Sequence, residues 1–327
     1  MPDNPQTNGD AMAATDDQID RLQERLDRVR TEIGKRIVGQ EAVIEQLLVC
    51  LLCDGNALLE SNPGLGKTSM IRALSEVVDL EFSRIQNTPD LMPSDITGTE
   101  IIRENEHGRE FVFEEGPVFA NVVLADEINR ATPKTQAALL EAMQEKQVTA
   151  AGETYALPRP FFVLATQNPI DQEGTYPLPE AQTDRFLLKI VLDYPSYDEE
   201  RRIVDLYTEG SGTPAVEQVV SRQQLQTMQS LVRELPIASD IRDRAISLVR
   251  ATRDAPSIEY GASPRASMAL VLAAKARAFL RGRAHVSWED VEAMAPAVLR
   301  HRILVDFRAE REGTTPDDAI ASLSVDG

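Results

Sequence analysis

The chain has 327 residues, of which 42% are hydrophobic, so it is long enough for about two domains with cores of their own. Its 53 acidic and 34 basic residues give a net charge of −19 at pH 7, which argues against broad binding to a nucleic-acid backbone, because that binding needs a basic face. No apolar run reaches the ~18 residues of a membrane span, and the start of the chain lacks the pattern of a secretory signal, so we expect a cytoplasmic protein.

The chain begins with a polar stretch over 1–14 that we expect to be disordered. From residue 15 to residue 33 apolar residues recur at intervals of three and four, which predicts an amphipathic helix. A second, more buried helix is expected over 41–53. Cys50 and Cys53 lie near its end. Their C-x-x-C spacing is that of a redox or zinc motif, but no second cysteine pair completes it, so we interpret both as core residues.

A short apolar strand over 56–59 leads into Gly66-Lys67-Thr68, the end of the phosphate-binding pattern G-x-x-x-x-G-K-[ST]. The first glycine of the pattern falls on Ser61, and Pro63-Gly64 can supply the turn instead. Backbone N–H groups of such a loop point at phosphate oxygens, Lys67 would reach the β- and γ-phosphates, and Thr68 would bind Mg²⁺. The nucleotide-binding residues predicted in this loop are Asn62, Pro63, Gly64, Leu65, Gly66, Lys67, Thr68 and Ser69.

Two further buried strands end in polar residues that suit the same chemistry. Asp126 and Glu127 follow the strand expected over 121–125, and Asn168 follows the strand expected over 160–165. Because the carboxyl ends of parallel strands meet at one crevice, these side chains should converge on the phosphate loop. There Asp126 would hold Mg²⁺, Glu127 would activate water, and Asn168 would position that water or sense the γ-phosphate.

Shorter patterns complete the prediction of an α/β fold. A parallel sheet with two β-hairpins, near 99–113 and 148–157, is expected in a first domain over 15–195. Beyond residue 195 the pattern changes to helices only, which predicts a smaller all-helical domain over 196–310 and a loose acidic tail over 311–327. The expected helices of the second domain cover 197–209, 221–233, 239–252, 264–281 and 287–299.

Several runs of residues resemble the MoxR family of AAA+ ATPases, in the clade with an insert in helix 2 that is related to the ATPase subunit of magnesium chelatase. These runs are Gly64–Thr68, Leu124–Ala131, Leu139–Glu145, Ala165–Ile170 and Gln172–Gln182. The resemblance implies a P-loop core of the AAA+ type, with the helical domain as its lid. The two hairpins would then be inserts typical of the clade.

The resemblance also implies roles for single residues. Val38, Gly39 and Gln40 would contact the adenine side of ATP, and Asn168 matches the first sensor. Arg185 matches the arginine finger, which acts on the nucleotide of a neighbouring subunit. Arg265 matches the second sensor, a lid contact to the γ-phosphate. Arg130 is a second candidate for work between subunits.

By the same resemblance we expect an ATPase that uses Mg²⁺ and assembles as a homo-oligomer, a hexameric ring. Its expected work is chaperone-like: remodelling or maturing protein complexes, including the insertion of metal cofactors, with a von Willebrand factor A domain protein as partner. The alternative is a regulatory switch with little turnover, in which bound nucleotide controls partner binding. A DNA-acting motor of the same superfamily is disfavoured by the acidic composition.

The acidic composition, with six lysines among the basic residues, also suggests a protein adapted to high salt. We therefore predict that its melting temperature rises from low to molar KCl, because ions screen the repulsion among exposed carboxylates. Thermal melts across this range measure the effect. A midpoint that stays level or falls would contradict the prediction.

Overall fold

The computed structural model describes residues 21–323 except 106–107, 151, 170–173 and 210–212. The disorder expected over 1–14 lies outside these residues. The N-terminal helix is described over 21–34, and its buried face carries Leu22, Leu26, Val29 and Ile33. This burial confirms the amphipathic pattern predicted for the helix from Leu22 to Ile33, and its predicted start over 15–20 lies outside the described residues.

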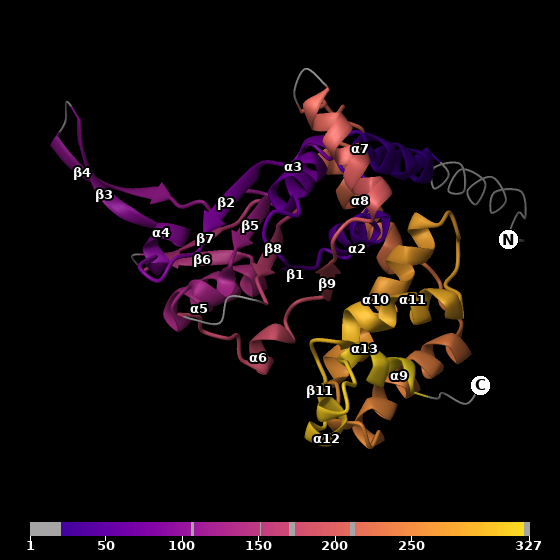
Figure 1. Cartoon of the computed structure of the whole chain (residues 1–327). Helices are drawn as coiled ribbons and strands as arrows, with labels where there is room; N and C mark the ends of the chain where they lie inside the picture. Colours follow the sequence, from indigo (N-terminus) through magenta and orange to yellow (C-terminus); the bar gives the residue numbers. More distant parts are fainter. Residues whose placement is uncertain (1–20, 106–107, 151, 170–173, 210–212, 324–327) are drawn as a thin grey trace, which may run out of the picture.

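Five parallel strands form the central sheet, in the order β2-β5-β8-β1-β9 (Figure 1). The strands are β1 (Ala57–Ser61), β2 (Phe82–Gln86), β5 (Val122–Asp126), β8 (Phe162–Gln167) and β9 (Leu188–Leu192). Strands β5 and β8 are covered on both faces, which is why the sequence shows them as continuous apolar runs. The α/β class predicted from the sequence is therefore confirmed.

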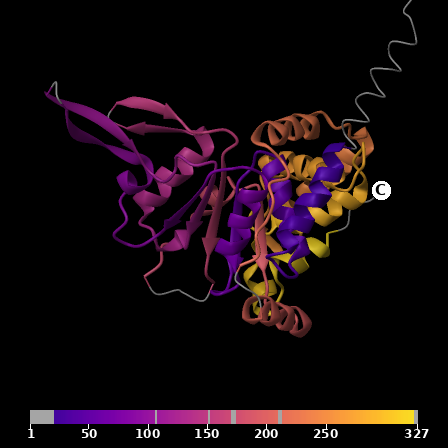
Figure 2. The same cartoon turned by 90° about the horizontal axis from the view of Figure 1, so that it is seen from above.

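Helices cover both faces of this sheet. Alternate strand residues point to opposite sides, and both sets are apolar, so each face needs a covering layer. Leu59 and Leu124 belong to a core on one side, and Leu58 and Val123 belong to a second core on the other side. The helices that complete these layers are α2 (Glu41–Leu52) and α3 (Lys67–Val77) on the first side and α5 (Pro133–Glu145) on the second. Figure 2 shows the C-terminal helices gathered beside the N-terminal ones, away from α5.

Cys50 in α2 and Cys53 just after it are free and buried. Burial raises the pKa of both thiols, so neither is a reactive thiolate. The two cysteines are core residues, as predicted. No helix among the described residues is both long and apolar enough to span a membrane.

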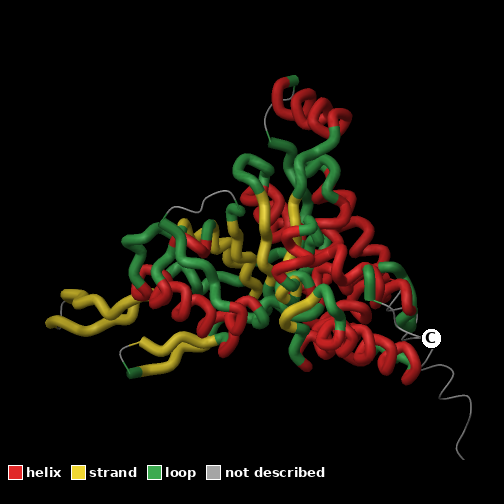
Figure 3. The backbone as a smooth tube through the Cα atoms, turned by 60° about the horizontal axis from the view of Figure 1, so that its bottom comes forward, coloured by secondary structure: helices red, strands yellow, loops and turns green. Residues whose placement is uncertain are grey.

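Two β-hairpins project from the sheet domain side by side (Figure 3). One pairs β3 (Gly98–Asn105) with β4 (Gly108–Glu115) and follows α4 (Pro93–Thr97), and the other pairs β6 (Gln147–Ala150) with β7 (Glu153–Ala156). Phe113 of β4 stacks on Tyr155 of β7 with ring centroids 4.1 Å apart. The structure therefore contains both predicted hairpins and joins them through an aromatic contact.

The structure contains the five helices that the sequence predicted after residue 195. They are α7 (Tyr197–Thr208), α8 (Arg222–Glu234), α9 (Ser239–Asp254), α10 (Pro264–Leu280) and α11 (Trp288–Leu299). One feature was missed: β10 (Ile258–Tyr260) and β11 (Leu304–Val305) form an antiparallel ladder. These strands are too short to show a periodic pattern in the sequence.

The expectation of a loose tail is wrong as far as residue 323. The chain forms α12 (Phe307–Arg311) and α13 (Pro316–Ala321), and Ala319 and Ile320 are buried. The acidic residues that suggested a solvated tail open α13 instead. Asp318 and Thr315 form a capping box, which satisfies free N–H groups at the helix start.

An ion-pair network joins the C-terminal domain to α2. Glu45 of α2 pairs with Arg277 of α10 at 3.3 Å and with Arg281, the C-cap of that helix, at 2.6 Å. Arg277 and Arg283 both pair with the fully buried Asp290 of α11. Burial by itself would raise the pKa of Asp290, but hydrogen bonds, the strongest from Arg283, lower it overall. Asp290 is therefore a buried, charged carboxylate.

We predict that Asp290→Ala lowers the free energy of unfolding by about 3 kcal/mol, because it leaves Arg277 and Arg283 without their buried counter-charge. Urea unfolding measures this loss. Glu292→Ala is the matched control, because Glu292 is an exposed carboxylate on the same helix and should change stability by no more than ~0.5 kcal/mol. A loss no larger than that of the control would contradict the role of Asp290.

Candidate functional site

The loop between β1 and α3 has the backbone of a phosphate-binding loop. Gly64 and Gly66 have φ angles of 83° and 78°, in the left-handed region that favours glycine. Gly66 is the N-cap of α3, so Lys67 and Thr68 open a helix of 11 residues. The N–H groups and the positive end of the helix dipole at this point form a site for an anion. The turn is made without a glycine at Ser61, which ends β1.

A cavity of about 550 Å³ lies beside this loop. Of the predicted nucleotide-binding residues, those that line it are Val38, Gln40, Pro63, Gly64, Leu65, Gly66 and Ser69. Gly39 lies against α7, where a side chain would collide with Glu199, and its φ of 69° also favours glycine. The structure thus brings the 38–40 segment to the phosphate loop, and its contact with adenine stays a prediction.

The far wall of this cavity was not predicted. Tyr194, Ile203 and Tyr207 line it, from the connection after β9 and from α7. Gln40 Nε2 donates to the carbonyl oxygen of Asp193 at 3.1 Å, which holds that connection in place. In the sequence the segment around Tyr194 was interpreted only as a domain boundary. A boundary between two domains is itself a common position for a ligand site.

Asp126 ends β5, and Thr166 of β8 fixes the backbone around it. The Thr166 hydroxyl donates to Asp126 Oδ1 at 2.7 Å and accepts from the backbone N–H of Glu127 at 2.8 Å. Glu127 has a φ of 54°, an uncommon value for a residue other than glycine, and starts the short η1 helix (Ile128–Arg130). One fully buried hydroxyl therefore sets the positions of both acidic residues.

Both acidic side chains are paired with arginines of the same chain. Asp126 Oδ2 lies 2.6 Å from Arg84 Nη2, and Glu127 Oε2 lies 3.1 Å from Arg130 Nη1. Arg84 comes from the neighbouring strand β2. Neither Arg84 nor Thr166 was predicted. Thr166 could have been noticed as a hydroxyl at the end of an apolar run, whereas nothing in the sequence marks Arg84.

The phosphate loop, Asp126 with Glu127, and Asn168 all lie at one edge of the sheet. Strands β1, β5 and β8 are parallel neighbours, and each of these groups follows the carboxyl end of its strand. Asn168 is buried there. The predicted convergence of these residues on one edge is therefore observed.

Arg185 lies at the opposite edge. Because β9 runs parallel to β1, with Leu188 beside Ala57 and Leu192 beside Ser61, Arg185 is near the start of β1 whereas the phosphate loop follows its end. Four residue steps of ~3.3 Å separate the two edges by about 13 Å, before the loops at either end are counted. In Figure 1, α3 and α6 (Glu180–Thr183), which precedes Arg185, lie on opposite sides of the strands.

Arg265 belongs to the same edge as Arg185. The Nη1 atom of Arg265 lies 3.2 Å from Oδ2 of Asp184, the residue that precedes Arg185. Both arginine side chains are exposed. Arg185 also lines a hollow of about 580 Å³ with Glu141 and Glu145 of α5. The structure therefore does not bring Arg185 or Arg265 to the phosphate loop of its own chain.

Comparison with known proteins places the chain in a family. Residues 56–188 match the family described as "ATPase family associated with various cellular activities (AAA)", and residues 250–323 match the "AAA lid domain". Chaperone MoxR1 of Mycobacterium tuberculosis is 45% identical to this chain, over 90% of this chain and 80% of that protein. The chain belongs to the MoxR family of AAA+ ATPases.

Other members and a solved structure agree with this assignment. Protein YeaC of Bacillus subtilis is 44% identical over 91% of this chain and 92% of its own length, and Protein MoxR of Methylorubrum extorquens is 31% identical over 89% and 91%. The crystal structure of a Cytophaga hutchinsonii protein, 41% identical, superposes with a TM-score of 0.89 over 96% of this chain and 97% of that one. The fold predicted by the resemblance, an AAA core with an AAA lid, is confirmed.

AAA+ ATPases generally bind nucleotide together with Mg²⁺, and the residues of this MoxR-family chain fit that ion. The Thr68 hydroxyl and the Asp126 carboxylate are hard oxygen donors of the kind Mg²⁺ prefers. The part of the chain that the structure describes holds no group of three or more His, Cys, Asp or Glu side chains that would form a different metal site.

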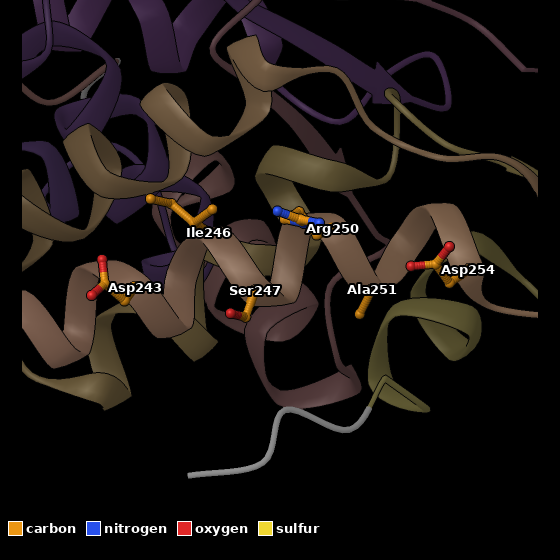
Figure 4. A pocket seen from close by; sticks show the side chains of 6 residues that line it. All are labelled: Asp243, Ile246, Ser247, Arg250, Ala251 and Asp254. Atoms are coloured by element: carbon orange, nitrogen blue, oxygen red, sulfur yellow. The ribbon is translucent and has the colours of Figure 1, made fainter.

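A hollow on the lid contains none of the predicted site residues. Figure 4 shows its lining, and all of it comes from α9. The lining residues are Asp243, Ile246, Ser247, Arg250, Ala251 and Asp254. A single helix face of this kind does not enclose a ligand, so the cavity beside the phosphate loop remains the candidate site.

We predict that Thr166→Val slows ATP hydrolysis by at least about tenfold, because it removes the hydroxyl that holds Asp126 and Glu127 while keeping the side-chain shape. Nucleotide affinity should change little, because the phosphate loop is untouched. Phosphate release and calorimetric titration with ATP measure the two effects. Thr166→Ser keeps the hydroxyl and is the control. Equal turnover in the valine and serine variants would contradict the role of Thr166.

Proposed function

We propose that this MoxR-family protein hydrolyses ATP at the cavity beside the phosphate loop. The observation that carries the proposal is the placement of Lys67 and Thr68, Asp126 and Glu127 at one sheet edge, with Thr166 bonded to both acidic residues. Lys67 binds phosphate and Thr68 and Asp126 hold Mg²⁺, which would neutralise charge on the phosphates when bound. Glu127 accepts a proton from the attacking water, and Asn168 orients that water.

We propose further that two neighbouring subunits complete each site. Arg185 cannot reach the phosphate loop of its own chain, because it lies at the far edge of the sheet. An exposed arginine in that position suits a finger that enters the neighbour's site, and Arg265 beside Asp184 suits a second trans contact. Such a head-to-tail interface closes into a ring, which we propose to be hexameric.

The proposed work of the ring is chaperone-like: remodelling or maturation of protein complexes, including metal-cofactor insertion, in the cytoplasm. A 45% identical relative is named Chaperone MoxR1, which supports this class of work. Ile102 and Phe111 lie opposite each other on the β3–β4 hairpin and are both exposed, as an apolar contact for another protein would be. A von Willebrand factor A domain protein is the proposed partner.

A regulatory switch with little turnover is the second candidate, and one observation favours it. Arg130 neutralises Glu127 and Arg84 neutralises Asp126 within the same chain. The Arg130 guanidinium occupies one carboxylate oxygen of Glu127, so Arg130 has to move before that oxygen can accept a proton from water. Steady turnover stimulated by a partner protein supports the motor, and near-zero turnover with nucleotide-dependent partner affinity supports the switch.

The proposed trans finger predicts complementation between two inactive variants. Glu127→Gln and Arg185→Ala should each lower the rate of phosphate release about a thousandfold, because one lacks the base and the other the finger. Mixed one to one, they should recover activity, since roughly a quarter of head-to-tail interfaces then pair an intact Glu127 with an intact Arg185.

Two affinity tags, one on each variant, establish that mixed rings form. If mixed rings form and phosphate release stays at the level of the single variants, Arg185 is not a finger in trans, and Arg130 becomes the next candidate. If no oligomer forms with ATP, a monomeric switch becomes the better description.

A further inference from the structure

Asp184 joins the segment that carries Arg185 to the lid. Its carboxylate accepts from Arg302 Nε at 2.8 Å on one oxygen, and from Arg265 Nη1 and Ser263 Oγ, both at 3.2 Å, on the other. Ser263 and Arg265 open α10, and Arg302 follows α11. One carboxylate of the core domain therefore holds three lid residues together.

Arg302 also binds the main chain on both sides of Arg185. Its Nη2 donates to the carbonyl oxygens of Asp184 and Phe186, and its Nη1 donates to that of Leu187. The Arg302 side chain is only 2% exposed, so these bonds lie in a dry environment and are correspondingly strong. The backbone around Arg185 is thus fixed to the lid, while the Arg185 side chain itself is exposed.

Arg302 is a buried cation whose ion-pair partner is Asp184. Next to Arg302, burial and the nearby guanidinium hold the pKa of His301 well below its usual value, so this imidazole is neutral. His301 Nε2 lies 3.1 Å from the Phe186 carbonyl oxygen and adds a further contact to the same segment. A buried guanidinium needs a paired anion, and Asp184 supplies it.

We propose that Asp184 is a positioning residue that sets Arg185 and Arg265 as one rigid unit for the active site of the neighbouring subunit. This inference rests on the proposed trans action of Arg185. Asp184 touches no nucleotide in its own chain, because it shares the sheet edge of Arg185. Asp184 positions Arg265 directly, through their ion pair. It positions the backbone of Arg185 indirectly, through Arg302. Any shift of the lid is thereby passed to the finger.

The test uses Asp184→Asn in the full chain. The amide is nearly the same size and keeps an oxygen for Arg302, but it loses the charge that holds Arg265 and compensates Arg302. We expect kcat for ATP hydrolysis to fall about tenfold to a hundredfold, since a small misplacement of a catalytic group costs this much, while KM for ATP changes less than about threefold. Glu180→Gln is the matched control, because it removes an exposed charge from α6, keeps the backbone carbonyl that accepts from the Asp184 N–H, and should leave kcat unchanged.

Subunit mixing separates positioning from general damage to the fold. A subunit with Asp184→Asn should still accept a finger, because its phosphate loop and Glu127 are intact, but it should fail to donate one. Mixed with Glu127→Gln it should therefore recover activity, since the Glu127→Gln subunit donates an intact Arg185. Mixed with Arg185→Ala it should not recover, because every donor is then defective.

The proposal is overturned if Asp184→Asn keeps the wild-type kcat, or if it recovers with Arg185→Ala. It is also overturned if Asp184→Asn fails to recover with Glu127→Gln while Glu127→Gln and Arg185→Ala recover together, because its defect then lies in the fold. Failure of that last pair in proven mixed rings instead refutes the trans finger, and the role of Asp184 falls with it. Two-tag purification shows mixing in each case.

Discussion

The direction of the parallel strands is the constraint on which the arrangement of this molecule depends. Because β1, β5, β8 and β9 all run the same way, every group that follows a strand lies at one edge and every group that precedes a strand lies at the other. The phosphate loop and the acidic pair follow strands, whereas Arg185 precedes one. The same sheet therefore presents the two halves of the proposed catalytic site on opposite edges, and only a second copy can bring them together.

Charge compensation inside the chain shapes both edges. Burying a carboxylate or a guanidinium is costly unless a partner of opposite charge is supplied. At one edge Arg84 forms an ion pair with Asp126, and Arg130 forms one with Glu127. At the other edge Asp184 forms an ion pair with Arg302. The first two pairs involve half-exposed arginines that can turn away when a nucleotide brings its own charge and metal. The Arg302 pair is buried and has no such freedom, which suits a fixed structural joint.

The sequence predicted the elements whose signals are local. The apolar runs around Leu124 and Leu164 predicted central strands, and Gly66-Lys67-Thr68 predicted the phosphate loop. Both kinds of signal depend only on residues that are adjacent in the sequence. It did not predict that Thr166 bonds to Asp126, or that Asp184 meets Arg302, since both contacts join residues distant in sequence whose meeting is decided by strand order and packing. It misread α13 because a helix cap and a solvated acidic tail share a composition.

The core that joins sheet and lid has a consequence for motion. A single hydrophobic cluster contains Leu59 of β1, Leu51 of α2 and Phe279 of α10, so the boundary that separates the two domains by secondary structure does not separate them by burial. An internal hinge between sheet and lid would expose that shared apolar surface to water, at a cost of roughly 25 cal/mol for each Å². Any displacement of the lid relative to the sheet therefore carries a free-energy cost that grows with the apolar area it uncovers.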